Sequence, residues 1–377
     1  MGVGMMGAGT VTTVPPPAGV TRFRSGSWIE RPLPSNAPIH PRNVDYLLEL
    51  NGQYNGVETD GTFATDGPLN TLNQHYLKLL GGADGATTTS FDTPIYEVTG
   101  SDTSYTLTAL SGSFFVPNRF KSVGDGGTGE GLRIPEIAKT HFLLGGPQSS
   151  DAPMCIYDVG RGYYANLAAT AWNAALSRWE VQSTGAGSIY FTSSYGLDSN
   201  NTNDATTTNP AEWPSSLYFY QDNHENHGYR GNNPMCRVID YDRMVAEDKV
   251  AYVTEMFAVR TGEANVFPMI GFESGKGGLI PEGTRLRIKT TIDVRQRLIS
   301  FGLSGTRLDQ ATLIAKGLQD YGIYLGDNSG SGCRLKLQAF QRENRTNLWQ
   351  VQEADIQTFG FGTSGDWEFI AAAYDPP

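Results

Sequence analysis

Apolar and polar residues alternate along several short stretches of the chain. The alternation is cleanest in 284–292 and 334–340, and 104–110 also shows it. Because successive side chains of a strand point to opposite faces, this period predicts strands with one buried face and one face in water. Further stretches with strand composition are 94–99, 154–158, 178–181, 188–191, 249–259 and 321–325.

One longer segment has helical spacing instead. In 307–320 the apolar residues recur every three or four positions, which places them on one face of a helix. Thr306 is expected to cap this helix, and Gly322 lies just past its end. The apolar residues of this face are Leu308, Ala311, Ile314, Ala315 and Leu318.

A short helix is also expected at 43–50, with Asn43 as its N-cap and Gly52 beyond its last residue. Many short strands with one packed amphipathic helix, 307–320, predict a mostly β fold, specifically a jelly-roll-like β-sandwich with long loops. The polar segment 198–214, rich in Asn and Thr, is expected to be one of these loops.

Residues 1–20 differ in composition from the rest of the chain, being rich in Gly, Thr and Pro and containing three prolines at 15–17. One interpretation is a flexible or polyproline tether. The other is an extended arm that docks on a neighbouring subunit through the strand-like segment 10–14, which would give a homo-oligomer. Residues 21–377 are expected to form a single large β-sandwich domain.

The composition agrees with a turn-rich β protein, since the 377 residues include 45 Gly and 20 Pro, with 11% aromatic and only 18% charged residues. The net charge is −11 and the basic residues are scattered, so a nucleic-acid partner is not expected. No stretch approaches about 18 consecutive apolar residues, so a membrane span is not expected either.

The location of the protein is indicated only by weak features. Cys155, Cys236 and Cys333 are far apart and odd in number, so at most one pair can form a disulfide, and the spacing does not suggest zinc. The first residues lack the basic and apolar regions of a signal peptide, so export would need a removed signal or another route. Acceptor-like triplets at Asn200 and Asn344 favour an extracellular or cell-surface location.

Three strings of the chain resemble a poorly characterised family of secreted, actinobacterial-type proteins. Residues 278–289 (GLIPEGTRLRIK) are similar to the family's P-x-G-x-R-L-R-L strand, and 315–327 (AKGLQDYGIYLGD) to its AL-x-x-YG-x-x-x-x-D segment. Residues 25–34 (SGSWIERPLP) are similar to its S-x-W-N-x-P-L-P opening. The resemblance covers about two-thirds of the chain and implies secretion, a β-jelly-roll fold and a link to polysaccharide.

The chain departs from this family in one strand. The family often has a His-Ala-Leu strand before the P-x-G-x-R segment, whereas the corresponding strand here, 250–255, has no histidine. Chemistry that depends on that imidazole is therefore not carried over.

Two glutamates are the expected catalytic residues. Glycoside hydrolysis typically uses two carboxylates on rigid elements, one protonated and one ionised. Glu255 and Glu180 each lie inside a predicted strand, and the period of two places Glu255 on the same face as Lys249, Ala251 and Val253. The alternative for each is a solvated or salt-bridged glutamate.

Aromatic residues concentrate between 163 and 220, among Asn, Ser and Thr. Flat rings stack on the apolar faces of sugars while neighbouring polar groups bond the sugar hydroxyls, so these residues are expected to bind substrate. The alternative is packing in the core. The expected substrate-binding residues are Trp172, Trp179, Trp213, Tyr218 and Tyr220.

No cofactor is expected. The Gly-rich segment 124–131 lacks the context of a phosphate loop. Asp327 and Asn328 could hold a structural calcium ion together with backbone carbonyls, or simply begin a turn. His224 and His227 could bind a metal, although the helix and third ligand of a zinc motif are absent, and a polar loop is the alternative.

Three classes of function follow from these features. The expected one is a secreted polysaccharide-degrading enzyme, a glycoside hydrolase or a lyase, whose partner is a polysaccharide or oligosaccharide. The alternatives are a non-catalytic carbohydrate-binding protein and a self-assembling structural surface, filament or shell protein that uses residues 1–20. Nucleophilic serine or cysteine catalysis has no support, because no G-x-S-x-G elbow is present and no histidine adjoins a cysteine.

Overall fold

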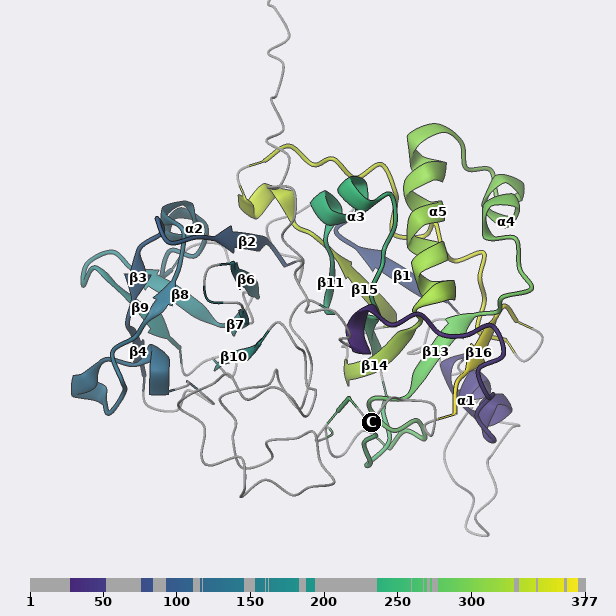
Figure 1. Ribbon diagram of the computed structural model, residues 1–377, viewed down its shortest axis with the longest axis horizontal. Coiled ribbons are helices and arrows are strands. Elements are labelled where there is room, and N and C mark those ends of the chain that lie inside the picture. The colour runs from purple at the N-terminus through teal and green to yellow at the C-terminus, as the bar shows by residue number, and fades with distance from the viewer. Residues whose placement is uncertain are drawn as a thin grey trace, which may run out of the picture.

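The fold is taken from a computed structural model. The structure describes residues 28–51, 76–83, 93–110, 116, 118–145, 153–159, 161, 163–182, 188–193, 236–258, 260–266, 268–269, 272, 277–328, 332–343, 345–362 and 365–371. The described residues form two lobes, which lie side by side in Figure 1. The small lobe consists of the described residues between 93 and 193, and the large lobe of the described residues before 84 and after 235.

A seven-stranded mixed sheet forms the large lobe. Its strands, in spatial order, are β1 (Leu77–Leu80), β15 (Cys333–Leu337), β12 (Thr254–Ala258), β14 (Ile323–Asn328), β13 (Arg285–Ile288) and β16 (Trp367–Phe369), and β11 (Val238–Ile239) also pairs with β15. The β1/β15, β11/β15 and β12/β14 pairs are parallel, and β12/β15, β13/β14 and β13/β16 are antiparallel. The strands therefore come from both ends of the sequence.

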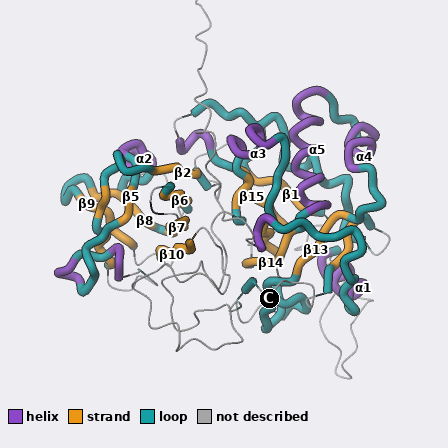
Figure 2. Tube along the Cα trace, viewed as in Figure 1, coloured by secondary structure: helices purple, strands orange, loops and turns teal. Residues whose placement is uncertain are grey.

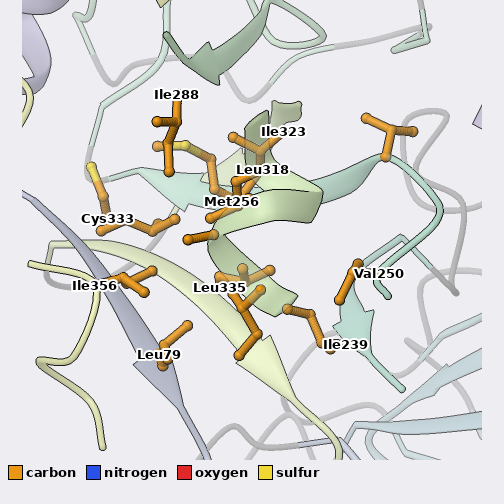
Figure 3. Packing of buried hydrophobic residues seen from close by; sticks show 14 of the residues in the cluster. Leu79, Ile239, Val250, Met256, Ile288, Leu318, Ile323, Cys333, Leu335 and Ile356 are labelled. Atoms are coloured by element: carbon orange, nitrogen blue, oxygen red, sulfur yellow. The ribbon is translucent and has the colours of Figure 1, made fainter. Parts of the chain in front are cut away.

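Helices pack on this sheet. They are η1 (Trp28–Glu30), α1 (Asn43–Leu50), α3 (Tyr241–Glu247), α4 (Val294–Ser300), α5 (Gly305–Asp320) and η7 (Phe340–Glu343). Leu318 of α5 meets Met256 of β12 and Ile323 of β14 in the apolar core (Figure 3). Gly317 lets α5 approach the chain closely, because a Cβ there would lie 2.6 Å from Cβ of Val250.

The helix predicted at 307–320 is confirmed, and all five residues of its apolar face are buried. Thr306 as its cap is wrong: α5 already begins at Gly305, and its N-cap is Ser304, whose side chain makes no capping hydrogen bond. The expectation of a single packed helix is also wrong, since α3 and α4 pack against the same core.

The helix predicted at 43–50 is confirmed as α1, but Asn43 is not its N-cap. The N-cap is Arg42, and Asn43 is the first helical residue. The Oδ1 atom of Asn43 instead accepts a hydrogen bond from the backbone N–H of Phe369 at 2.7 Å. The side chain therefore joins α1 to β16.

Short strands form three small sheets in the small lobe. One has the order β10 (Ser188–Ser193), β7 (Tyr163–Ala168), β6 (Met154–Asp158) and β2 (Ile95–Val98). The others are β4 (Leu107–Ala109), β9 (Arg178–Val181) and β8 (Thr170–Asn173), and the pair β3 (Ser104–Tyr105) and β5 (Leu132–Arg133). The helices are η2 (Asn118–Phe120), η3 (Val123–Asp125) and α2 (Glu136–His141), and the lobe has its own apolar cluster. Figure 2 shows strands in both lobes.

The lobes meet where the chain enters β2. The backbone N–H of Ala339 donates to the carbonyl of Thr93 at 3.1 Å. The backbone N–H of Ile95 donates to Oε1 of Glu343 at 2.8 Å. Ile95 and Tyr157 of the small lobe also belong to the apolar core of the large lobe, so the contact is both polar and apolar.

The mostly β prediction is confirmed, and the jelly-roll part is not. A jelly roll is built from antiparallel strands, whereas five pairings among the described strands are parallel. Period-two alternation is common to both kinds of sheet, so the sequence pattern does not separate them.

Two strand predictions need correction. The predicted strand 249–259 is shorter, because among its described residues, 249–258, only β12, Thr254–Ala258, is strand. Within 284–292 only β13 is strand, and it has no wet face: all of β13 is buried, and Arg287 donates hydrogen bonds to the carbonyls of Pro34 and Ser35. Residues 1–20 and 198–214 lie outside the described residues.

The three cysteines are free and buried. None of the described helices has the length and apolarity needed to cross a bilayer.

Candidate functional site

Glu255 is the second residue of β12 and is fully buried. Met256, its neighbour in sequence, points into the core beneath α5 (Figure 3). Successive side chains of a strand alternate between its faces, so Glu255 and Phe257 point to the opposite face of the sheet. The carboxyl group therefore lies on the face that α5 leaves uncovered.

Two side chains contact the Glu255 carboxyl group. The Tyr324 hydroxyl donates a hydrogen bond to Oε2 at 3.3 Å, and Nε of Arg237 lies 3.4 Å from Oε1. Tyr324 is the register partner of Glu255 on the neighbouring strand β14. The backbone N–H of Glu255 donates to the carbonyl of Cys236 at 2.7 Å, which holds the segment before β11 against β12.

Arg237 also contacts a second carboxylate, that of Asp327. Its Nη2 atom lies 3.1 Å from Oδ2 of Asp327. Its guanidinium carbon lies 5.0 Å from the centre of the Phe257 ring, and Nζ of Lys336 lies 4.9 Å from that ring. We call Glu255, Arg237, Tyr324, Asp327, Lys336 and Phe257 the Glu255 cluster.

A β-bulge brings Asp327 to this face. Tyr324 pairs with Glu255 and Leu325 with Met256, but Phe257 pairs with Asp327, so Gly326 is an extra residue. Tyr324 and Asp327 are three positions apart and would point to opposite faces of a regular strand. The extra residue restores them to one face, which is the way in which bulges redirect side chains.

Burial raises the pKa of the Glu255 carboxyl group to about 8. The negative charge of Asp327 acts in the same direction, while Arg237, Lys336 and the Tyr324 hydroxyl lower the pKa without cancelling the effect of burial. Glu255 is therefore mostly protonated at neutral pH, and it is able to donate a proton. Burial and the Glu255 charge also raise the pKa of the Cys236 thiol, which leaves it a poor nucleophile.

Polar contacts continue from Asp327 along the end of β14. The Nδ2 atom of Asn328 donates to the Thr261 hydroxyl at 3.1 Å, and that hydroxyl donates to Oε1 of the buried Glu282 at 2.9 Å. Glu282 belongs to the PEGTR segment, and Asp327 ends the segment 315–327. Two of the three resemblance strings, 278–289 and 315–327, therefore contribute residues to this region of the sheet.

Glu180 lies elsewhere. It is part of β9 in the small lobe, whereas β14, the neighbour of Glu255, is in the large lobe (Figure 1). Nη2 of Arg178 lies 2.7 Å from its Oε1, and Nδ2 of Asn173 donates to the same oxygen at 3.1 Å. Burial acts to raise the pKa of Glu180, but these hydrogen bonds outweigh it and leave the pKa lowered. The structure does not bring the two predicted carboxylates together.

The predicted aromatic surface is only partly described. Trp179 is fully buried in the small-lobe core, which is the packing alternative given above, and its ring has no exposed face in this structure. Trp172 is half-buried; Tyr105 and Trp179 pack edge-to-face with it, and Nζ of Lys139 lies 4.2 Å from its ring centre. The residues outside the described part are Trp213, Tyr218, Tyr220, His224 and His227.

Among the described residues, no group of three or more His, Cys, Asp or Glu side chains is arranged to hold a metal ion. Asp327, the residue considered for a calcium ion or a turn, is paired with Arg237, and its Oδ1 accepts the backbone N–H of Asn328 at 2.8 Å. The guanidinium charge beside it disfavours a second cation at that carboxylate.

Sequence reasoning selected Glu255 and missed its surroundings. Arg237 and Lys336 lie 18 residues before and 81 residues after Glu255, and no local pattern connects them to it. The local sequence around Asp327 indicates only a turn or a calcium ligand. A signal that could link it to Glu255 is the glycine before it, which directly follows the predicted strand 321–325, because a glycine in a strand often marks a bulge.

The comparisons with known proteins give no relative. No family model matches the chain, and neither a curated protein nor a solved structure matches it.

Proposed function

We propose that the protein is a polysaccharide-degrading enzyme, a glycoside hydrolase, in which Glu255 is the proton donor and Asp327 is the ionised partner. One observation carries this proposal: a fully buried carboxyl group with a pKa of about 8 shares the guanidinium of Arg237 with a second, ion-paired carboxylate. Two carboxylates whose surroundings separate their protonation states are the requirement of acid/base glycoside cleavage. Asp327 takes the place that the sequence analysis gave to Glu180.

In this proposal the Glu255 carboxyl group gives its proton to the glycosidic oxygen while the bond from that oxygen to the anomeric carbon breaks. Asp327 activates the water that adds to the anomeric carbon, or attacks that carbon itself before water does. Arg237 orients both carboxyl groups. The side chain of Asp327 is 18% exposed and that of Glu255 is not exposed, so substrate reaches the cluster from the Asp327 side.

Two features of the sequence bear on the substrate and on an extracellular or cell-surface location. The resemblance to secreted proteins linked to polysaccharide includes the strings that contain Glu282 and Asp327. The net charge of −11 favours neutral over strongly anionic polysaccharides.

The test is a panel of polysaccharides assayed both for reducing ends and for the ultraviolet absorbance of unsaturated products. We expect reducing ends without that absorbance, and a loss of about 10²- to 10⁴-fold in kcat for Glu255→Gln. Asp327→Asn should lose activity similarly. Glu180→Gln is the matched control, because it removes a buried, ion-paired carboxylate of the other lobe.

Each other outcome identifies a different function. Unsaturated product would make the protein a lyase, and heat of binding in titration calorimetry without any product would make it a carbohydrate-binding protein. If Glu255→Gln is as active as the parent while Glu180→Gln is inactive, the assignment of the Glu255 cluster as the active site is wrong.

A further inference from the structure

A positive φ does not account for the glycine at position 326. Its backbone φ lies outside the left-handed region that favours glycine. Glycines with positive φ occur nearby on the same strand connection, as at Gly322, where φ is +74°. The requirement at position 326 is therefore one of space.

The space is filled by Glu255. A Cβ atom at position 326 would lie 2.2 Å from Cδ, 2.3 Å from Cγ and 2.5 Å from Oε1 of Glu255. These are its three nearest atoms, and all belong to one side chain. The carboxyl group of Glu255 thus lies close to the backbone of the bulge, with Tyr324 at its Oε2 atom and Arg237 at its Oε1 atom.

We propose that Gly326 is a positioning residue for Glu255: the missing side chain creates the space in which the carboxyl group is held between Tyr324 and Arg237. The same residue is the extra one in the bulge, and it thereby places Asp327 on the same face of the sheet as Glu255. One glycine therefore sets both the place of the proton donor and that of its partner. The catalytic meaning of this inference rests on the proposed function, but the contact itself does not.

The experiment is a double-mutant cycle of Gly326→Ala and Glu255→Ala, with the melting temperature Tm as the first readout. Gly326→Ala alone should lower Tm, because the buried carboxyl group must move. In the Glu255→Ala background the same substitution should lower Tm by much less, since the three clashing atoms are gone. Gly362→Ala is the matched control, because a Cβ there meets only Nδ2 of Asn51, at 3.9 Å.

A second measurement distinguishes a role of Gly326 in placing the Glu255 carboxyl group from an effect on the stability of the protein alone. The titration of Glu255, followed by carboxyl NMR, should move upward in Gly326→Ala, because the displaced group leaves Tyr324 and Arg237, which both favour the charged form. Activity should fall by about 100-fold, the usual cost of a misplacement of about 1 Å in an active site. Gly362→Ala should change neither.

The inference is overturned if Gly326→Ala lowers Tm equally with and without the Glu255 side chain, or if the titration of Glu255 does not move. If Gly326→Ala alone does not fold, the double variant decides: it should fold, and its failure to do so also overturns the inference. Absence of activity in the parent would contradict the proposed function only, because the Tm cycle and the titration need no substrate.

Discussion

The buried carboxyl group of Glu255 makes the stability of the large lobe depend on pH in a defined direction. In the unfolded chain a glutamate ionises near its ordinary value of 4.5, whereas in the folded protein Glu255 keeps its proton up to about pH 8. Between these values unfolding releases a proton, so a rise in pH favours the unfolded chain. The free energy of unfolding should therefore fall from about pH 4.5 to about pH 8 and then stop responding to Glu255.

The size of the effect follows from the two pKa values. A folded pKa of about 8 and an ordinary value of 4.5 differ by about 3.5, which corresponds to about 5 kcal/mol at pH values above both. Glu255→Gln replaces the carboxyl group with a neutral side chain of similar shape that does not titrate. The difference in free energy of unfolding between variant and parent should then change by about 3 to 4 kcal/mol between pH 5 and pH 8, in favour of the variant.

Urea unfolding of both proteins at each pH, followed by the fluorescence of the buried Trp349 and Trp367, measures this difference. Glu343→Gln is the matched control, because burial raises the pKa of Glu343 only to about 7. From pH 7 to pH 8 the Glu255→Gln difference should still grow by about 1 kcal/mol, against a few tenths for Glu343→Gln. A difference for Glu255→Gln that is the same at pH 5 and pH 8 would refute a protonated Glu255.

Three further predictions concern other parts of the chain. Trp179→Ala should destabilise the small lobe by about 3 to 5 kcal/mol, measured by urea unfolding, because the ring is fully buried; an unchanged stability would contradict its place in the core. Asn43→Ala should cost about 1 kcal/mol in the same assay, because Phe369 loses its hydrogen-bond acceptor; no change would show that water replaces the bond. Deletion of residues 1–20 should reduce the particle size in light scattering if the arm joins subunits, and a monomer before and after deletion would exclude that role.

Local patterns predicted the elements that local chemistry determines. The apolar spacing of 307–320 was sufficient for α5, because every residue of that face contacts the same core. The pattern of 284–292 predicted a strand but not its surroundings: Pro34 and Ser35, which accept hydrogen bonds from Arg287 of β13, are 253 and 252 positions away from it. The environment of a strand depends on which distant segments lie over it, and alternation contains no such information.

The site could be predicted only in part for the same reason. A charged residue inside an apolar strand was sufficient to select Glu255, because burial of a carboxylate needs a compensating contact. Glu180 has the same local pattern, yet its partner Arg178 is two residues away and leaves it ionised. At Glu255 burial outweighs the ion-pair and hydrogen-bond partners, and those partners come from distant segments. Its protonation therefore becomes evident only when β12, β14 and β15 are side by side.

The pairing of β1 with β15 has a consequence for how the chain folds during its synthesis. Leu77 lies beside Cys333 in this parallel pair, and the small lobe is inserted between them in the sequence. A ribosome adds about 5 to 20 residues per second, so β1 waits roughly 10 to 50 seconds for its neighbour to be made. The small-lobe sheets need only residues that are already present and can form first. Until residue 333 has left the ribosome, Leu77 and Leu79 have no β15 to pair with, and in this interval the nascent chain is most exposed to aggregation and to the binding of chaperones.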